Sequence, residues 1–246
     1  MLNHPTLEKL HELNLHGMLA ALREQTNMPG CESLGFEERL GLLVDREATD
    51  RENRRLTTRL KQAKLRQSAT IEDIDYRHPR GLDKAAVLAL ASCKWIQKHQ
   101  NCIVTGPTGA GKSYIACALA HKACREGFSV LYQRIPRMFQ ELAVARENGR
   151  YPRLLSAYAK TGLLVMDDWG LSPLTDEQRR DLFEILEDRY DLRSTLVTSQ
   201  LPIAKWHGLI GDPTLADALL DRLVHNAHKL TLKGESMRKK IGNSGE

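Results

Sequence analysis

A glycine-rich run near the middle of the chain carries the clearest chemical signal. The run Gly106-Pro-Thr-Gly-Ala-Gly-Lys112-Ser113 matches the pattern G-x-x-x-x-G-K-[ST] in full. Its glycines let the backbone curl so that N–H groups point at phosphate oxygens, and a following helix N-terminus adds partial positive charge. Lys112 would reach the β- and γ-phosphates, and the Ser113 hydroxyl would ligate Mg²⁺. We therefore predict a site for ATP and Mg²⁺, with these nucleotide-binding residues: Gly106, Pro107, Thr108, Gly109, Ala110, Gly111, Lys112, Ser113 and Tyr114.

Two adjacent acids follow a short apolar run further along the chain. Asp167 and Asp168 come directly after the apolar segment Gly162–Met166. A phosphate-binding loop needs a second acidic group on a neighbouring strand to hold Mg²⁺. Asp167 fits that role as a metal ligand beside Ser113, and Asp168 would orient and activate the attacking water.

A third segment, Ser194–Ser199, ends in polar residues. If this strand lies between the two strands that carry the phosphate loop and the acids, then Thr198, Ser199 or Gln200 can sense the γ-phosphate. The alternative is that these residues only cap a strand and begin the turn at Pro202.

Positioning these groups requires a sheet whose strands end at the same edge. From about residue 68 the chain alternates strand and helix signals, which predicts an α/β fold: a parallel five-stranded sheet with helices on both faces. The predicted strands are Asn101–Thr105, Ser129–Arg134, Gly162–Met166, Ser194–Ser199 and Lys229–Leu232.

The first 66 residues show helical spacing of apolar residues and no strand signal. The segment Asn27–Gly30 interrupts this pattern, and a second helical stretch runs from Phe36 to about Arg66. We predict a small all-helical N-terminal domain over residues 1–66 and an ATPase domain over 67–246, with Asp75–Leu82 as a linker or turn.

The second helical stretch carries a basic run that could contact phosphates. Its basic residues, all except Lys64 within about half of the helix circumference, are Arg51, Arg54, Arg55, Arg59, Lys61, Lys64 and Arg66. We predict that Arg51, Arg54, Arg55 and Arg59 bind DNA, with a solvated helix face as the alternative.

Composition sets further bounds. The chain has 246 residues, a net charge of +5, 41% hydrophobic and 27% charged residues, values that disfavour disorder. No apolar run approaches the roughly 18 residues that a membrane helix needs, and the N-terminus has no leader pattern, so we expect a cytoplasmic protein that avoids membranes. Aromatic residues make up only 5%, which disfavours a base-stacking platform.

Several motifs outside the phosphate loop resemble one family. The combination of loop, paired acids and polar-ended strand resembles AAA+ ATPases, and the motifs narrow this to the IstB-type transposition helper ATPases. Those motifs are Leu15-His-Gly-Met18, Arg39-Leu-Gly-Leu-Leu43, Arg51-Glu-Asn-Arg-Arg55, Asp167-Asp-Trp-Gly170, Thr198-Ser-Gln-Leu-Pro202, Gly211-Asp-Pro-Thr-Leu-Ala-Asp217, Asp221-Arg-Leu223 and Gly234-Glu-Ser-Met-Arg238. The resemblance implies an AAA+ core with a truncated helical lid, related to DnaC-type helicase loaders and DnaA-type initiators.

The resemblance also implies partners and roles. Such proteins form homo-oligomers on duplex DNA with ATP at subunit interfaces, and they help a separate transposase to choose and deform its target. Arg222 matches the arginine that reaches into a neighbour's ATP; a surface ion pair is the alternative. Asp168 stands where many AAA+ proteins have glutamate, which implies slow hydrolysis, and Gln200 stands where loaders often have asparagine. Arg238 matches either a second nucleotide sensor or a basic tail on DNA.

By the same resemblance, the region between the second and third strands lines the pore for nucleic acid. Its basic residues are Arg134, Arg137, Arg146, Arg150, Arg153 and Lys160, and we predict the first four as DNA contacts. The sequence has no base-reading motif, so we expect recognition of DNA backbone and shape.

Three other functions stay open at this stage. A replicative helicase loader shares the ATPase core but acts on single-stranded DNA. A small-molecule kinase would share the phosphate loop, although the basic run and the missing acceptor-binding signature disfavour it. A nucleotide-gated interaction module without turnover is compatible with Asp168 in place of glutamate.

Overall fold

The computed structural model describes residues 5–234 and 236–237, and its centre is a five-stranded parallel sheet in the order β2-β3-β4-β1-β5. The strands are β1 (Asn101–Thr105), β2 (Val130–Arg134), β3 (Leu163–Trp169), β4 (Ser194–Ser199) and β5 (Ala227–Thr231). All five predicted strands are confirmed. The largest differences are that β3 continues past Met166 to Trp169 and that β5 begins at Ala227 rather than Lys229.

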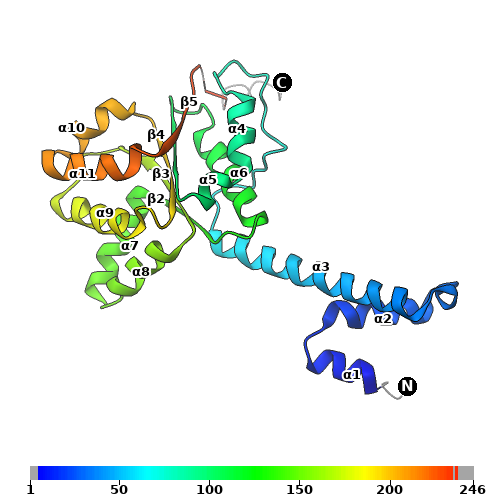
Figure 1. The fold of residues 1–246 in the computed structure, drawn as a ribbon. Helices are drawn as coiled ribbons and strands as arrows, with labels where there is room; N and C mark the ends of the chain where they lie inside the picture. The colour runs from blue at the N-terminus through cyan, green and yellow to red at the C-terminus, as the bar shows by residue number, and fades with distance from the viewer. Residues whose placement is uncertain (1–4, 235, 238–246) are drawn as a thin grey trace, which may run out of the picture. The chain divides into compact units, whose positions relative to one another are not determined.

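Helices cover both faces of this sheet. Figure 1 shows α4, α5 and α6 on one face and α7 to α11 on the other. The helices after residue 63 are α4 (Lys84–Ala91), α5 (Lys94–Gln97), α6 (Lys112–Arg125), α7 (Ile135–Glu147), α8 (Tyr151–Lys160), α9 (Asp176–Arg189), α10 (Trp206–Ile210) and α11 (Pro213–Val224), with a short 3-10 turn η2 (Ile203–Lys205). The fold is therefore α/β and of the P-loop AAA+ kind.

Two central strands of the sheet, β1 and β4, are fully buried. Every residue of β1 and β4 is buried, because a parallel strand covered on both faces has no solvent side. On the face of α7 to α11, Trp169 and Trp206 pack with ring centroids 5.2 Å apart. The tryptophan of the Asp-Asp-Trp-Gly motif is thus a core residue that anchors the end of β3.

The end of β3 departs from a regular strand. Met166 pairs with Val197 and Trp169 pairs with Ser199, so β3 uses one residue more than β4 over this step. Asp168 lies in this bulge with φ of 65°, a left-handed conformation that is uncommon outside glycine. Its backbone N–H donates to Thr198 Oγ1 at 3.2 Å. The bulge separates the two neighbouring acids, so that Asp167 is buried and Asp168 is partly exposed.

The N-terminal region is helical, as predicted. It contains α1 (Pro5–Glu12), α2 (His16–Asn27), a 3-10 turn η1 (Cys31–Ser33) and α3 (Phe36–Ala63). The chain forms two compact units, residues 1–58 and 59–246, so the division falls inside α3. The domain boundary at residue 66 stays a prediction.

Within the N-terminal unit, α2 packs closely against α3. A Cβ added at Gly17 would lie 2.6 Å from Glu47 Cα, so only glycine fits at this crossing. The Glu47 carboxylate accepts hydrogen bonds from the backbone N–H of Gly17 at 2.7 Å and of Met18 at 3.2 Å. The Leu-His-Gly-Met motif therefore marks a helix crossing.

The described chain ends soon after β5. Between that strand and residue 237, the residues that the structure describes form no further helix, and the truncated lid stays a prediction. Across the same described part of the chain, no helix has the length and apolar character needed to span a membrane.

Candidate nucleotide-binding site

The glycine-rich loop joins β1 to the N-terminus of α6. Gly109 and Gly111 have φ values of +82° and +96°, so the loop needs glycine at these turns. A Cβ at Gly111 would also lie 2.4 Å from Arg80 Nη1. Gly111, the residue before α6, has no side chain that could cap the first turn of the helix. A helix N-terminus favours an anionic ligand.

The three groups predicted to act on phosphate and metal lie together. Ser113 Oγ donates to Asp167 Oδ1 at 2.8 Å, and its distance to Asp167 Oδ2 is 3.0 Å. Lys112 is buried, and its Nζ donates to the carbonyl of Pro107 at 2.9 Å, within the loop itself. Hydroxyl and carboxylate oxygens are ligands that Mg²⁺ prefers, and it commonly takes only one or two from protein, with phosphates and water completing the set. Ser113 and Asp167 fit that donor set.

Asp167 is fully buried and has partners on every side. Thr198 Oγ1 donates to its Oδ1, and the Tyr132 hydroxyl donates to its Oδ2. Arg66 Nη1 lies 3.5 Å from the same Oδ2. Burial and the hydrogen bond to Asp167 both raise the pKa of Tyr132, so that this hydroxyl remains a donor. Asp167 is thus fixed by residues from β2, β4 and the segment after α3.

Asp168 faces a different partner. Arg134 Nε, at the end of β2, donates to Asp168 Oδ2 at 2.8 Å. The Asp168 side chain is 17% exposed and the Arg134 side chain 46% exposed, so this ion pair lies at the mouth of the site. The residue predicted to activate water is accessible to it, but Arg134 holds its carboxylate in this structure.

The polar-ended strand lies where the prediction required. β4 runs between β3 and β1, and Gln200 Oε1 accepts a hydrogen bond from Thr108 Oγ1 of the loop at 2.8 Å. Ser199 Oγ donates to the carbonyl of Trp169 at 2.9 Å, so it joins strand ends. Of the candidate sensor residues, Gln200 touches the loop and Thr198 touches Asp167.

A pocket of about 430 Å³ surrounds these groups, a size ordinary for small-molecule sites, which span roughly 300–1,000 Å³. It is lined by Arg66, Gln67, Asp73, Asp75, Arg80, Thr108, Gly109, Gly111, Lys112, Ser113, Tyr114, Arg134, Asp168, Leu171, Gln200 and Met237. Of the predicted site residues, most of the loop, Asp168 and Gln200 line this pocket, and the buried Asp167 joins them through its contact with Ser113. In the described residues, no group of three or more His, Cys, Asp or Glu side chains could hold a metal alone.

Arg80 belongs to this site and was not predicted. It is 1% exposed although it lies in the segment predicted as a linker. Its Nη1 donates to the carbonyl of Ala110 at 3.1 Å, and its Nη2 donates to that of Asp75 at 2.9 Å. Burial lowers the pKa of this guanidinium. No motif marks Arg80, Tyr132 or Arg66 as site residues, because their roles depend on contacts between distant segments.

Arg222 lies away from the loop of its own chain. Its Nη1 donates to the carbonyl of Ala218, its Nε donates to Glu187, and its guanidinium lies 5.0 Å from the ring of Phe183. It lines a small pocket with Asn101 and Thr195, at the start of β1 and β4, whereas the phosphate loop follows the end of β1. Arg222 cannot serve the ATP of its own chain, and its role toward a neighbour stays a prediction. Arg238 lies outside the described residues.

The arginines predicted for the first DNA surface have partners inside the chain. Arg51 Nε donates to Glu47 Oε1 at 2.6 Å, and Arg54 Nη2 donates to it at 3.3 Å. Arg59 Nε donates to the carbonyl of Cys124, at the end of α6, at 2.8 Å. Arg55 is exposed. Because Arg51, Arg54 and Arg59 also stabilise the fold, the basic run is not a simple row of solvated charges.

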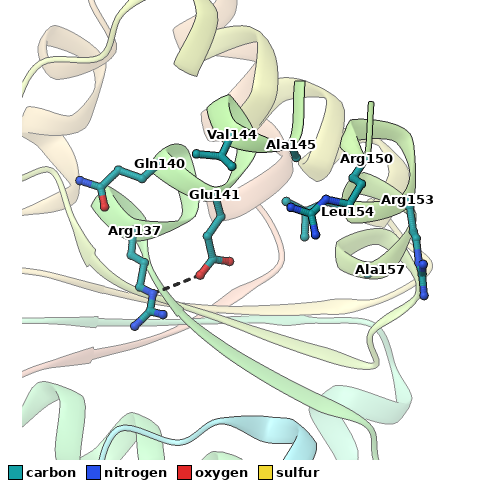
Figure 2. A pocket seen from close by; sticks show the side chains of 9 residues that line it. All are labelled: Arg137, Gln140, Glu141, Val144, Ala145, Arg150, Arg153, Leu154 and Ala157. Carbon is teal, nitrogen blue, oxygen red and sulfur yellow. Dashed lines mark hydrogen bonds and ion pairs between the residues drawn. The ribbon is translucent and has the colours of Figure 1, made fainter. Parts of the chain in front are cut away.

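The second basic set divides between two places. Arg146 is bound to Asp181 and Glu177 and lies 4.2 Å from the ring of Tyr151, and Arg134 is bound to Asp168 as described above. Arg137, Arg150 and Arg153 line a groove of about 630 Å³ between α7 and α8, shown in Figure 2. The groove residues are Arg137, Gln140, Glu141, Val144, Ala145, Arg150, Arg153, Leu154 and Ala157. Arg137 pairs there with Glu141 at 3.1 Å. DNA binding by this set stays a prediction.

Comparison with known proteins identifies relatives over nearly the whole chain. The family model of IstB-like ATP binding proteins matches residues 8–244. A protein of Sinorhizobium fredii described as an insertion sequence ATP-binding protein is 54% identical over 239 residues, which cover 97% of this chain and 98% of that protein. A protein of Pseudomonas aeruginosa described as the insertion sequence IS21 ATP-binding protein is 34% identical over 232 residues, covering 94% and 86%.

Solved structures show the same fold at low identity. The structure of DnaI has a TM-score of 0.57 and 20% identity, covering 68% of this chain and 92% of that one. The DnaC helicase loader has a TM-score of 0.55 and 19% identity, covering 67% and 97%. AMPPCP-bound DnaA from Aquifex aeolicus has a TM-score of 0.56 and 17% identity, covering 74% and 55%. These similarities confirm the AAA+ core.

Proposed function

Because this chain belongs to the family of IstB-like ATP binding proteins, we propose that it is a Mg²⁺-dependent ATPase that assembles on duplex DNA and assists a transposase in target selection and transposition. The observation that carries the proposal is the contact of Ser113 Oγ, at the end of the phosphate loop, with Asp167 at 2.8 Å. The relatives' descriptions as insertion sequence proteins support the transposase as partner.

In this proposal the nucleotide binds at the N-terminal end of α6. Backbone N–H groups of the loop and the helix dipole favour the polyphosphate, and Lys112 exchanges its contact with the Pro107 carbonyl for phosphate oxygens. Ser113 and Asp167 hold Mg²⁺, which neutralises charge on the phosphates when bound. Gln200, already in contact with Thr108, lies where it can respond to the γ-phosphate.

Hydrolysis needs a base and a second positive charge. Asp168 orients the attacking water, which requires that Arg134 release or share its carboxylate. A guanidinium supplied by Arg222 of a neighbouring copy stabilises the charge that develops on the γ-phosphate. The position of Arg222 away from its own loop supports action between copies, and so a homo-oligomer with ATP at its interfaces.

DNA contacts in this proposal come from exposed arginines on two surfaces. Arg55 on α3, together with Arg137 and Arg150 at the α7–α8 groove, leaves guanidinium groups in reach of phosphates. Such contacts fix a protein on the DNA backbone without reading bases. A cytoplasmic location accords with a protein that acts on DNA.

Steady-state ATP turnover tests the proposal. The purified protein is assayed alone, with duplex DNA and with single-stranded DNA at equal nucleotide concentration, each with Mg²⁺ and with EDTA. We expect Mg²⁺-dependent turnover that duplex DNA stimulates most. Asp168→Asn should bind ATP but lose about 100-fold or more in turnover, because a general base contributes that much. Wild-type turnover in this variant would exclude the role of Asp168.

A helicase loader is the second candidate, and the fold similarity to DnaI and the DnaC helicase loader supports it. In that case single-stranded DNA should be the stronger activator. Turnover that responds to neither form of DNA would contradict both candidates and favour a kinase or a module without turnover.

A further inference from the structure

Arg66 lies in an unexpected place for a member of a predicted DNA-binding run. Helix α3 ends at Ala63, and Lys64 adopts a left-handed backbone with φ of 51° that breaks the helix. After this turn the Arg66 side chain enters the nucleotide pocket, where its Nη1 lies 3.5 Å from Asp167 Oδ2. Burial lowers the pKa of Arg66, but a hydrogen bond with Tyr132 and the nearby charge of Asp167 outweigh it and raise that pKa. Arg66 is therefore a cation held beside the metal aspartate.

The partners of Asp167 differ in their freedom to move. A carboxylate offers about four lone-pair positions, and Asp167 engages Ser113, Thr198, Tyr132 and Arg66 with them. Tyr132 and Thr198 are buried on the two strands that flank β3. Ser113 would share the metal with Asp167. Arg66 alone among these four is a long, 42% exposed side chain outside any helix or strand.

A divalent cation at Asp167 changes the electrostatics of Arg66. The carboxylate that attracts the guanidinium would then be neutralised by a closer double charge, and the two cations would repel each other. Metal binding thus acts on the Arg66 side chain and on the turn at Lys64.

We propose that Arg66 is a positioning residue that holds Asp167 in the nucleotide-free site and withdraws when Mg²⁺ and ATP bind. This rests on the proposed nucleotide and Mg²⁺ site. Because the segment Lys64–Gln67 directly follows α3, the withdrawal changes the chain at the end of that helix. The conformation at the end of α3 thereby depends on whether Mg²⁺ and ATP are bound at the site.

The first test measures competition between Arg66 and Mg²⁺. A fluorescent, non-hydrolysable ATP analogue is bound to the full chain while Mg²⁺ is titrated, for wild type, Arg66→Gln and the control Arg77→Gln. Arg77 is 99% exposed and contacts only Asp75 among the described residues, at 3.8 Å for the ion pair. We expect the Mg²⁺ midpoint to fall at least threefold in Arg66→Gln and to stay unchanged in the control.

Two results of that titration would overturn the inference. An unchanged midpoint would mean that Arg66 does not compete with the metal. A loss of analogue binding at every Mg²⁺ concentration would instead make Arg66 a phosphate ligand. Absence of analogue binding in wild type would refute the nucleotide site itself, and with it the inference, whereas a missing response to DNA would refute only the wider function.

A second measurement uses the unmodified chain and so does not depend on how a variant folds. Trypsin cleavage after Arg66 is followed by mass spectrometry with and without Mg²⁺ and the analogue. We expect cleavage at this bond to accelerate several-fold on loading in wild type and not in Lys112→Ala. Equal or slower cleavage in the loaded wild type would contradict the withdrawal of Arg66.

Discussion

Helices α2 and α6 begin in the same way and are completed differently. Neither the first turn of α2, after Leu15, nor that of α6, after Gly111, has a capping side chain from its own N-cap residue. In α2 the carboxylate of Glu47 accepts the N–H groups of Gly17 and Met18. In α6 the residue before the helix is Gly111, which has no side chain to take that place.

The difference teaches how one physical property serves two purposes. A helix N-terminus carries unpaired N–H groups and partial positive charge, and both favour an anion. Where the helix only supports the fold, a distant part of the chain provides the anion and compensates it with Arg51 and Arg54. At α6, where we propose that a ligand binds, Asp167 accepts a hydrogen bond from the Ser113 hydroxyl instead.

The largest expected effect is on ATP binding at the N-terminal end of α6. Lys112→Ala should weaken ATP binding about 100-fold or more, equal to about 3 kcal/mol, because it removes charge-assisted contacts with the phosphates. Isothermal titration calorimetry measures the affinity. Lys122→Ala, on the same helix but paired with Glu126, is the control and should bind ATP normally. Unimpaired binding by Lys112→Ala would mean that the N-terminal end of α6 is not the phosphate site.

A substitution at the N-terminal end of α2 should change the stability of this helix and leave ligand binding unchanged. Glu47→Gln removes the buried charge that α2, Arg51 and Arg54 all use, so it should destabilise α2 by about 2 kcal/mol. Hydrogen exchange of the α2 amides measures this, and ATP affinity should not change. Asp45→Asn, at an exposed position of α3, is the matched control. Equal exchange in both variants would show that Glu47 does not complete α2.

Acid should also destabilise the N-terminal end of α2, because it protonates Glu47. Burial raises the pKa of Glu47, but hydrogen bonds from Arg51 and from the backbone of Met18 and Gly17 outweigh it, so that the pKa lies below its ordinary value near 4.5. A depressed pKa stabilises the folded state above pH 4.5, and this stabilisation is lost as pH falls through the folded value.

The measurement is the difference in α2 protection factors between wild type and Glu47→Gln. This difference should be largest near neutral pH and narrow below pH 4.5, by less than the whole effect of the substitution. A difference that stays constant to pH 3 would mean that the charge of Glu47 has no part in holding α2.

Much of the nucleotide site could be predicted from local pattern. Glycine spacing before Lys112 specifies a loop that cradles phosphate, and a run of apolar residues before Asp167 specifies a buried strand that delivers an acid. The α/β fold followed from alternating strand and helix signals, and so did the place of Gln200 once β4 was assumed to lie between β1 and β3. These signals are contained in a few consecutive residues.

The roles of the basic residues could not be predicted in that way. Arg59 and Arg66 belong to one helical run by sequence, yet one binds the end of α6 and the other approaches Asp167. Arg80 is in a segment with linker composition and is nonetheless buried under the loop. A long cationic side chain can bind water, DNA phosphates, a carboxylate or a backbone carbonyl. The residues next to it in the sequence do not decide which of these partners it binds.

The sequence by itself determined the groups that could do chemistry in this protein: a glycine-rich loop with the phosphate-binding pattern, an aspartate after a buried strand, and a sheet that brings them to one edge. Only the tertiary structure decided which charges neutralise which. Glu47 with α2, Arg134 with Asp168 and Arg66 with Asp167 are pairs between segments far apart in the chain. Loops and strands follow from local backbone preference, whereas ion pairs depend on distances that exist only after the segments have packed together.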